Sequence, residues 1–142
     1  MTSQAGAGPR QSSTRREPIS YEAAPPRVRA VYDDIMQTRG VNWVNNFWKV
    51  LAHDPVTLER LWQNVKQVMA AGALDPLAKE IAYIAVSVTN GCGYCIASHT
   101  ASARGKGLTP QQLSELVAVI GLANETNRLA TAYNVPVDNE YL

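Results

Sequence analysis

The sequence has few cysteines, no excess of charge of either sign and no long apolar run. Its 142 residues include two cysteines, too few for the disulfide framework of a small secreted protein. The 13 Lys and Arg residues are balanced by 12 Asp and Glu, which argues against a dedicated nucleic-acid binder. No apolar run reaches the ~18 residues that a membrane span needs. We therefore expect a chain of one-domain size, with neither nucleic acid nor membrane as a partner.

The N-terminal region lacks the apolar stretch of a secretory signal peptide. Residues 1–18 are rich in Ser, Gln, Gly and Ala, and Glu17 follows Arg15 and Arg16 where an apolar segment would be required. We predict a polar arm over residues 1–18 and a helical domain over residues 19–142. The expected compartment is the cytoplasm, where a close cysteine pair is more often catalytic or metal-binding than structural.

Helix-start signals divide the rest of the chain. Three residue pairs place a capping side chain, Asp or Thr, before a proline at the first helical position. Apolar residues at helical spacing follow, which predicts amphipathic helices after each start. Further helices are expected over residues 27–37 and 124–133, with Gly121 as a candidate break before the last one. The three pairs are Asp54-Pro55, Asp75-Pro76 and Thr109-Pro110.

Residues 81–88 are ambiguous, because a short apolar run of this kind suits either a buried strand or a helix. The run continues from the start at Asp75-Pro76, and the combined length of about sixteen residues favours a helix. Asn90 and Gly91 then end it, and the next helix begins near Cys92. No βαβ unit is visible, so we predict an all-α fold, a single-domain bundle of six or seven helices.

The two cysteines stand three residues apart and share a helix face with a histidine. Cys95 and His99 are separated by four residues and are therefore neighbours on a helix, and Cys92 lies seven residues before His99 on the same face. The helix N-terminus and a nearby imidazolium both favour the thiolate, which is the reactive form of cysteine. Cysteines at this spacing can also form a reversible disulfide.

The sequence is compatible with four interpretations of this cluster. The cysteines form a redox dithiol with His99 as its base; or they bind zinc, with His53 or Glu80 as a fourth ligand. The third interpretation is a thioredoxin-like site, which would need a strand before the motif. The fourth is a purely structural role, in which the cysteines are small buried apolar residues and no nearby histidine is required. Haem attachment is excluded, because Ile96 occupies the position after the second cysteine where a histidine is required. His53 is otherwise interpreted as a structural residue.

The pattern E-x11-C-x2-C-x3-H, formed by Glu80, Cys92, Cys95 and His99, resembles the alkylhydroperoxidase D-like branch of the carboxymuconolactone decarboxylase family. The resemblance covers roughly residues 20–137, and the chain is similar to the members described as peroxidase-related. Other similar segments are LAHDP at residues 51–55, KEI at 79–81, VSVTN at 86–90, GLT at 107–109 and NRLA at 127–130.

The resemblance implies a thiol-dependent peroxidase with no metal or organic cofactor. Cys95 would attack an organic hydroperoxide, Cys92 would resolve the resulting sulfenic acid to a disulfide, and an external dithiol of lipoyl or thioredoxin type would restore the pair. His99 would take the thiol proton, and Glu80 would complete the proton relay. The family also implies a homo-oligomer, a trimer or a hexamer.

One position departs from the family pattern. The family's best-studied peroxidases have a histidine just before the second cysteine, where this chain has Tyr94. A phenol is protonated near neutral pH and cannot act as a base, so Tyr94 is expected to donate a hydrogen bond or to wall the substrate pocket. Two other functions remain as alternatives: a lactone enzyme of the decarboxylase type, which does not need two thiols, and a non-enzymatic redox switch.

Overall fold

A computed structural model describes residues 14–142, and every regular element in that part of the chain is helical. This confirms the all-α prediction. The chain forms two compact units, one up to Val68 and one from Met69 onward. The expected polar arm lies outside the described residues as far as residue 13; residues 14–18 are exposed and not helical, and the arm's boundary at residue 18 stays a prediction.

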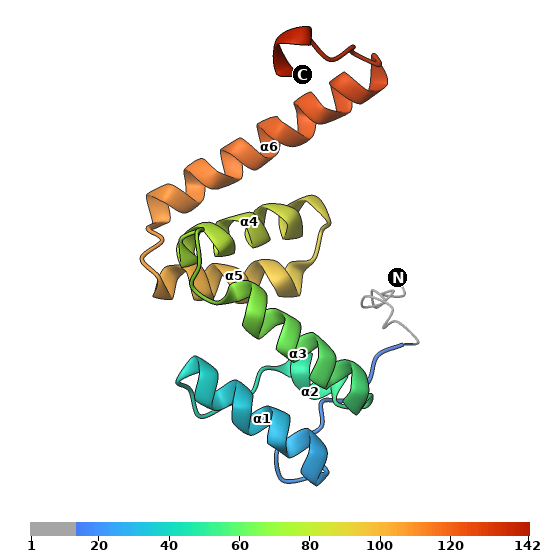
Figure 1. The fold of residues 1–142 in the computed structure, drawn as a ribbon, viewed down its shortest axis with the longest axis vertical. Helices are drawn as coiled ribbons and strands as arrows, with labels where there is room; N and C mark the ends of the chain where they lie inside the picture. Colours follow the sequence, from blue (N-terminus) through green and yellow to red (C-terminus); the bar gives the residue numbers. More distant parts are fainter. Residues whose placement is uncertain (1–13) are drawn as a thin grey trace, which may run out of the picture. The chain divides into compact units, whose positions relative to one another are not determined.

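In its described part, from residue 14 onward, the first unit contains three helices (Figure 1), and their buried side chains form an apolar core. Apolar residues recur along one face of the first helix, where Val28, Tyr32 and Ile35 are buried, and the third helix contributes Leu58 and Trp62 to the same core. Burial of these large side chains is the main force that stabilises the unit. The helices are α1 (Pro26–Arg39), α2 (Asn46–Leu51) and α3 (Pro55–Met69).

His53 holds the segment before α1 in place. Its Nε2 atom lies 2.9 Å from the backbone oxygen of Glu17. The next turn of this segment is held by the backbone N–H of Ile19, which donates to the oxygen of Lys49 at 3.0 Å, and by the hydroxyl of Tyr32, which donates to the oxygen of Ile19 at 3.0 Å. These contacts support the structural interpretation of His53.

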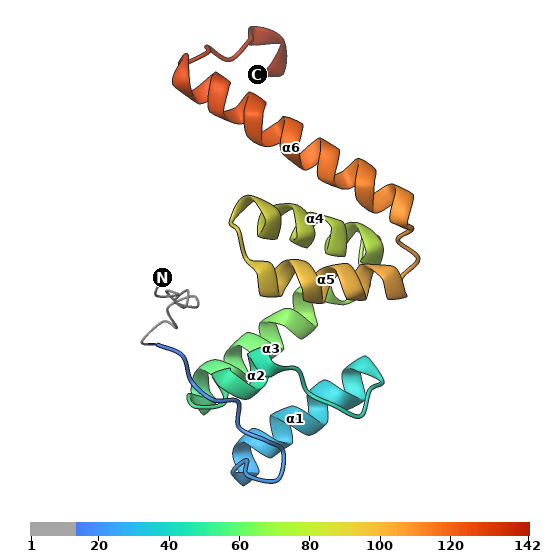
Figure 2. The same ribbon diagram turned by 180° about the vertical axis from the view of Figure 1, so that it is seen from behind.

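The second unit is built on a pair of antiparallel helices that lie side by side in both views (Figures 1 and 2). Asp75 accepts hydrogen bonds from the backbone N–H groups of Leu77 and Ala78 and so caps the first of them. The ambiguous residues 81–88 lie inside this helix, as their length predicted. The helices of this unit are α4 (Pro76–Thr89), α5 (Gly93–Gly105) and α6 (Pro110–Ala132), followed by the short 3-10 helix η1 (Asn139–Tyr141).

Helix α6 is continuous, so the break expected at Gly121 does not occur. A glycine inside a helix weakens it by about 1 kcal/mol without ending it, and packing of Ile120 into the core of the unit outweighs that cost. Thr109 and Gln112 form a capping box at the helix start. Among the described residues, no helix combines the length and apolar character needed to cross a membrane.

The turn between α4 and α5 depends on a left-handed residue. Gly91 has φ of 69°, a conformation that residues with a Cβ atom rarely adopt. The next residue, Cys92, is tied back to α4, because its N–H donates to the backbone oxygen of Ser87 at 3.0 Å. Gly91 therefore sets the position from which α5 and its cysteines begin.

We expect Gly91→Ala to destabilise the protein by about 1–2 kcal/mol, because alanine is strained at this backbone conformation. The matched control is Gly121→Ala, which should stabilise by about 0.5–1 kcal/mol, because Gly121 is helical and a Cβ atom there meets nothing within 4 Å. Urea unfolding followed by far-ultraviolet circular dichroism measures both. If Gly91→Ala leaves the stability unchanged or raises it, the left-handed turn assigned to Gly91 is wrong.

Candidate redox site at the start of helix α5

The two cysteines form a disulfide at the beginning of α5. Cys92 is the N-cap residue and Cys95 lies in the first turn, with their Cα atoms 5.3 Å apart. The Cys92 sulfur also accepts a hydrogen bond from the backbone N–H of Cys95 at 3.3 Å, where a capping oxygen usually sits. Both residues are half-buried. The disulfide therefore lies at a helix N-terminus and is partly accessible to reagents in solution.

Two serines, Ser87 and Ser98, form hydrogen bonds around the cysteine segment. Ser87, buried near the end of α4, donates from its hydroxyl to the oxygen of Tyr83 at 2.7 Å, and its own backbone oxygen holds Cys92. Ser98 in α5 donates to the oxygen of Cys95 at 3.2 Å. These bonds give the cysteine segment a defined backbone position.

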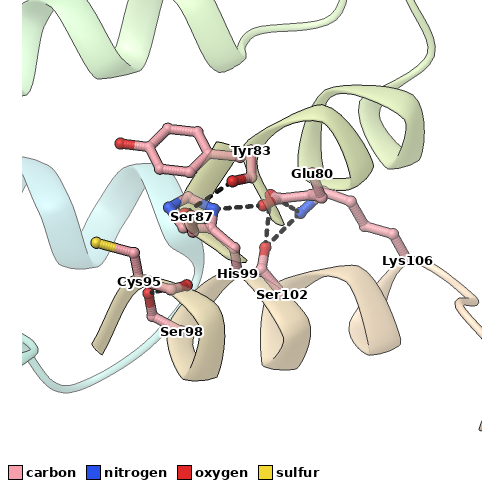
Figure 3. A network of polar contacts seen from close by, with 8 residues as sticks. All are labelled: Glu80, Tyr83, Ser87, Cys95, Ser98, His99, Ser102 and Lys106. Atoms are coloured by element: carbon pink, nitrogen blue, oxygen red, sulfur yellow. Dashed lines mark hydrogen bonds and ion pairs between the residues drawn. The ribbon is translucent and has the colours of Figure 1, made fainter. Parts of the chain in front are cut away.

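Helices α4 and α5 bring Glu80 and His99 together. Oε2 of Glu80 lies 2.7 Å from Nδ1 of His99, although the residues are nineteen positions apart in the chain (Figure 3). Glu80 is 4% exposed, so its carboxylate must be satisfied by protein groups. Of the four residues in the sequence motif, two form the disulfide and two form this pair; Glu80 lies on α4, Cys92 is the N-cap residue of α5, and the other two lie in the first half of α5.

Two residues that the sequence reasoning missed complete the surroundings of Glu80. Its other oxygen, Oε1, accepts hydrogen bonds from the hydroxyl of Ser102 at 2.7 Å and from Nζ of Lys106 at 2.9 Å (Figure 3). Lys106 also donates to Ser102 at 2.8 Å. The signal was present in the sequence: Ser102 and Lys106 follow His99 at helical spacings of three and seven, on the face already assigned to the cysteines.

These contacts keep Glu80 ionised inside the protein. Burial alone raises the pKa of its carboxyl, but the hydrogen bonds from His99, Ser102 and Lys106, together with the charge of Lys106, outweigh burial and lower the pKa to about 2. At neutral pH Glu80 is therefore a carboxylate and only accepts hydrogen bonds. It follows that Nδ1 of His99 donates the hydrogen that Glu80 accepts; in the neutral form of the ring, Nε2 is then the acceptor.

The imidazole of His99 is also held on its face. The ring of Tyr83 stacks on it with centroids 3.6 Å apart and an angle of 17° between the planes. Figure 3 shows the second ring nitrogen of His99 on the side away from Glu80, toward which Cys95 lies. In the disulfide state no hydrogen bond joins His99 to either sulfur within residues 14–142. The ring is thus fixed by Glu80 at one edge and Tyr83 on one face.

Tyr94, expected at the substrate pocket, lies in the first turn of α5 and is 45% exposed. Two hollows are outlined by described residues, one in each unit, and Tyr94 lines neither of them. Its place in a pocket stays a prediction. Within residues 14–142, no three His, Cys, Asp or Glu side chains gather where they could hold one metal ion.

The unit is all-helical, and it carries a C-x2-C disulfide and a buried glutamate that is paired with a half-buried histidine; these features define the class of helical thiol–disulfide proteins. The model of the carboxymuconolactone decarboxylase family matches residues 55–138, and the chain belongs to that family, in its alkylhydroperoxidase D-like branch. The solved alkylhydroperoxidase AhpD core from Rhodospirillum rubrum is 51% identical, with a TM-score of 0.85, over 92% of this chain and 98% of that one.

Curated relatives match shorter stretches. The alkyl hydroperoxide reductase AhpD of Solibacter usitatus is 36% identical over 72 residues, which are 51% of this chain and 39% of the relative. The protein of the same name from Maricaulis maris is 39% identical over 57 residues, 40% of this chain and 33% of its own length. The chain thus matches well under half the length of these relatives.

The charge of Glu80 predicts a specific acid sensitivity. Because folding lowers its pKa from 4.5 to about 2, its stabilisation is complete above pH 4.5 and is lost as the pH falls through 2. With about 1.4 kcal/mol for each pKa unit, the loss is roughly 3 kcal/mol. Glu80→Gln should lack this component of the acid dependence.

Urea unfolding between pH 4.5 and 2 checks this prediction. The matched control is Glu125→Gln, which changes an exposed glutamate of α6 and should retain the wild-type acid dependence. If Glu80→Gln and the wild type lose stability in parallel over this range, Glu80 is not a group whose pKa is lowered by folding.

Proposed function

We propose that this protein is a thiol-dependent peroxidase that reduces organic hydroperoxides through Cys92 and Cys95. The observation that carries the proposal is the disulfide at the start of α5, four residues from a histidine that a buried carboxylate holds. The names of the relatives from Solibacter usitatus and Maricaulis maris support the same activity, as alkyl hydroperoxide reductases.

The reaction begins from the reduced dithiol. The Cys95 thiolate attacks the terminal oxygen of the hydroperoxide, the O–O bond breaks, and Cys95 becomes a sulfenic acid while an alkoxide leaves. The Cys92 sulfur then attacks the Cys95 sulfur and displaces water, which forms the disulfide. The peroxide has taken up two electrons from the dithiol, and the products are an alcohol and water.

The Glu80–His99 pair supplies the proton transfers. Nε2 of His99 takes the proton of the Cys95 thiol and returns it to the departing alkoxide, which makes the leaving group neutral. Glu80 holds Nδ1 of the ring and stabilises the imidazolium that forms in between. Cys92, as the N-cap residue, is the thiol at which an external dithiol of lipoyl or thioredoxin type would open the disulfide by exchange. The cytoplasm suits such a reductant and remains the proposed compartment.

A thiol count tests the peroxidase proposal directly, because the chain has two cysteines in all. We expect the reduced protein to lose both thiols when one equivalent of cumene hydroperoxide is added, and to turn over further peroxide only when dihydrolipoamide or a thioredoxin is supplied. Cys95→Ser should abolish consumption of peroxide. Cys92→Ser should stop at a sulfenic acid on Cys95, which dimedone captures.

Each contrary result has a definite meaning. If both thiols survive the hydroperoxide, the peroxidase proposal fails and a lactone enzyme of the decarboxylase type becomes the better candidate. If the thiols are lost once but no dithiol supports turnover, the pair acts as a redox switch. If Cys95→Ser reacts like the wild type, Cys95 is not the attacking thiol.

We also propose that the chain works as a homo-oligomer, a trimer or a hexamer. Support comes from α6, where apolar side chains are half or more exposed, as a surface that meets another subunit would be. These residues include Val119 and Leu122, which are 62% and 63% exposed and lie three positions apart on one face of the helix.

Sedimentation velocity tests the oligomer. We expect a single species with three or six times the mass of the chain, and Leu122→Glu should shift it to smaller species, because a buried unpaired charge weakens an interface. Gln111→Glu, an exposed change nearer the start of α6, serves as the control and should leave the mass unchanged. A wild-type monomer would contradict the proposal.

A further inference from the structure

Lys106 and Ser102 take no part in the motif that identifies the site, yet both contact the carboxylate on which the site depends. They follow His99 on the same face of α5, and Lys106 is the C-cap residue of that helix. Their donors and Oε1 of Glu80 form a closed triangle with sides of 2.7, 2.8 and 2.9 Å. Every oxygen–donor contact in it is within hydrogen-bonding distance.

The two carboxylate oxygens of Glu80 have different hydrogen-bond partners. Oε1 is occupied by Ser102 and Lys106, and Oε2 is left for Nδ1 of His99. A carboxylate held at one oxygen cannot rotate to present the other elsewhere. Lys106 also forms an ion pair with Glu80, with its Nζ atom 2.9 Å from Oε1.

We propose that Lys106, supported by Ser102, is a positioning residue of the proton relay: it anchors Glu80 as a fixed anion, so that the thiol proton stays on His99. This inference rests on the proposed function. The proton leaves the Cys95 thiol for Nε2 of His99 and returns to the alkoxide, and it does not pass on to Glu80. Lys106 touches neither sulfur and is not a catalytic residue.

The groups that face Glu80 define how its charge responds to pH. His99 and Lys106 approach it from α5, and Tyr83 of α4 covers the imidazole of His99. No hydrogen bond or ion pair from α6 reaches Glu80 within the described residues. Without the ammonium of Lys106, burial would raise the pKa of Glu80, and the carboxyl would be protonated at a higher pH. A protonated Glu80 is a weaker, uncharged acceptor and holds the Nδ1 hydrogen of His99 less strongly.

The test measures the reactivity of the reduced cysteines toward iodoacetamide as a function of pH, in the full chain. Lys106→Met should move the acid limb of the rate profile to higher pH and lower the rate on that limb about tenfold, the effect of losing one charge-assisted hydrogen bond. Lys106→Arg keeps the charge and should restore most of the wild-type profile. Ser102→Ala should move the limb in the same direction by less.

Arg104→Met is the matched control. Arg104 is an exposed cation in the last turn of the same helix, and the structure gives it no ion pair with Glu80. It should keep the wild-type profile. If Lys106→Met also keeps it, or if Lys106→Arg fails to restore it, the proposal is overturned and Lys106 acts through packing. If Lys106→Met does not fold, the pH profile of Ser102→Ala provides the test instead. A Ser102→Ala profile that is the same as the wild-type profile overturns the proposal.

Nitrogen-15 NMR of the His99 ring provides a second readout. In the wild type the neutral ring should carry its proton on Nδ1, and Lys106→Met should show a larger share of the other tautomer. An unchanged tautomer ratio would contradict the proposal that Lys106 anchors Glu80. Neither alkylation nor NMR needs a peroxide, so a wild type that consumes no hydroperoxide removes the proposed function and leaves the assignment of Lys106 to be judged on these measurements.

Discussion

The site depends on a buried negative charge that two helices share. Glu80 comes from α4, and three donors that satisfy it come from α5, so the carboxylate joins the helices at the same time as it orients His99. A buried charge is costly unless hydrogen bonds and an opposite charge satisfy it. The geometry of the Glu80–His99 pair and the packing of α4 against α5 are therefore coupled through one side chain.

A second constraint acts at the other end of the pair of helices. The left-handed turn at Gly91 reverses the chain, and Cys92 is tied to Ser87 of α4 before α5 begins. The cysteines thus start at a position set by α4, the helix that also carries Glu80. Helix α5 connects the two arrangements, because four residues after Cys95 place His99 on the face toward Glu80.

Much of this architecture could be read from local patterns. Proline after a capping residue marked the starts of α3, α4 and α6, and length resolved residues 81–88 as helix, because these effects act within a few residues. The sequence did not reveal that α6 continues through Gly121. Whether a helix survives an unfavourable residue depends on packing of neighbours such as Ile120, which a local pattern does not contain.

The sequence by itself determined the helical class, the starts of α3, α4 and α6, and the four-residue spacing that places Cys95 and His99 on one helix face, since periodicity and capping are local. Only the tertiary structure decided which oxygen of Glu80 meets His99, and that Ser102, Lys106 and Tyr83 surround the pair. Those contacts require α4 to lie against α5. Their strength comes from burial, which removes competing water and exists only after the helices have packed.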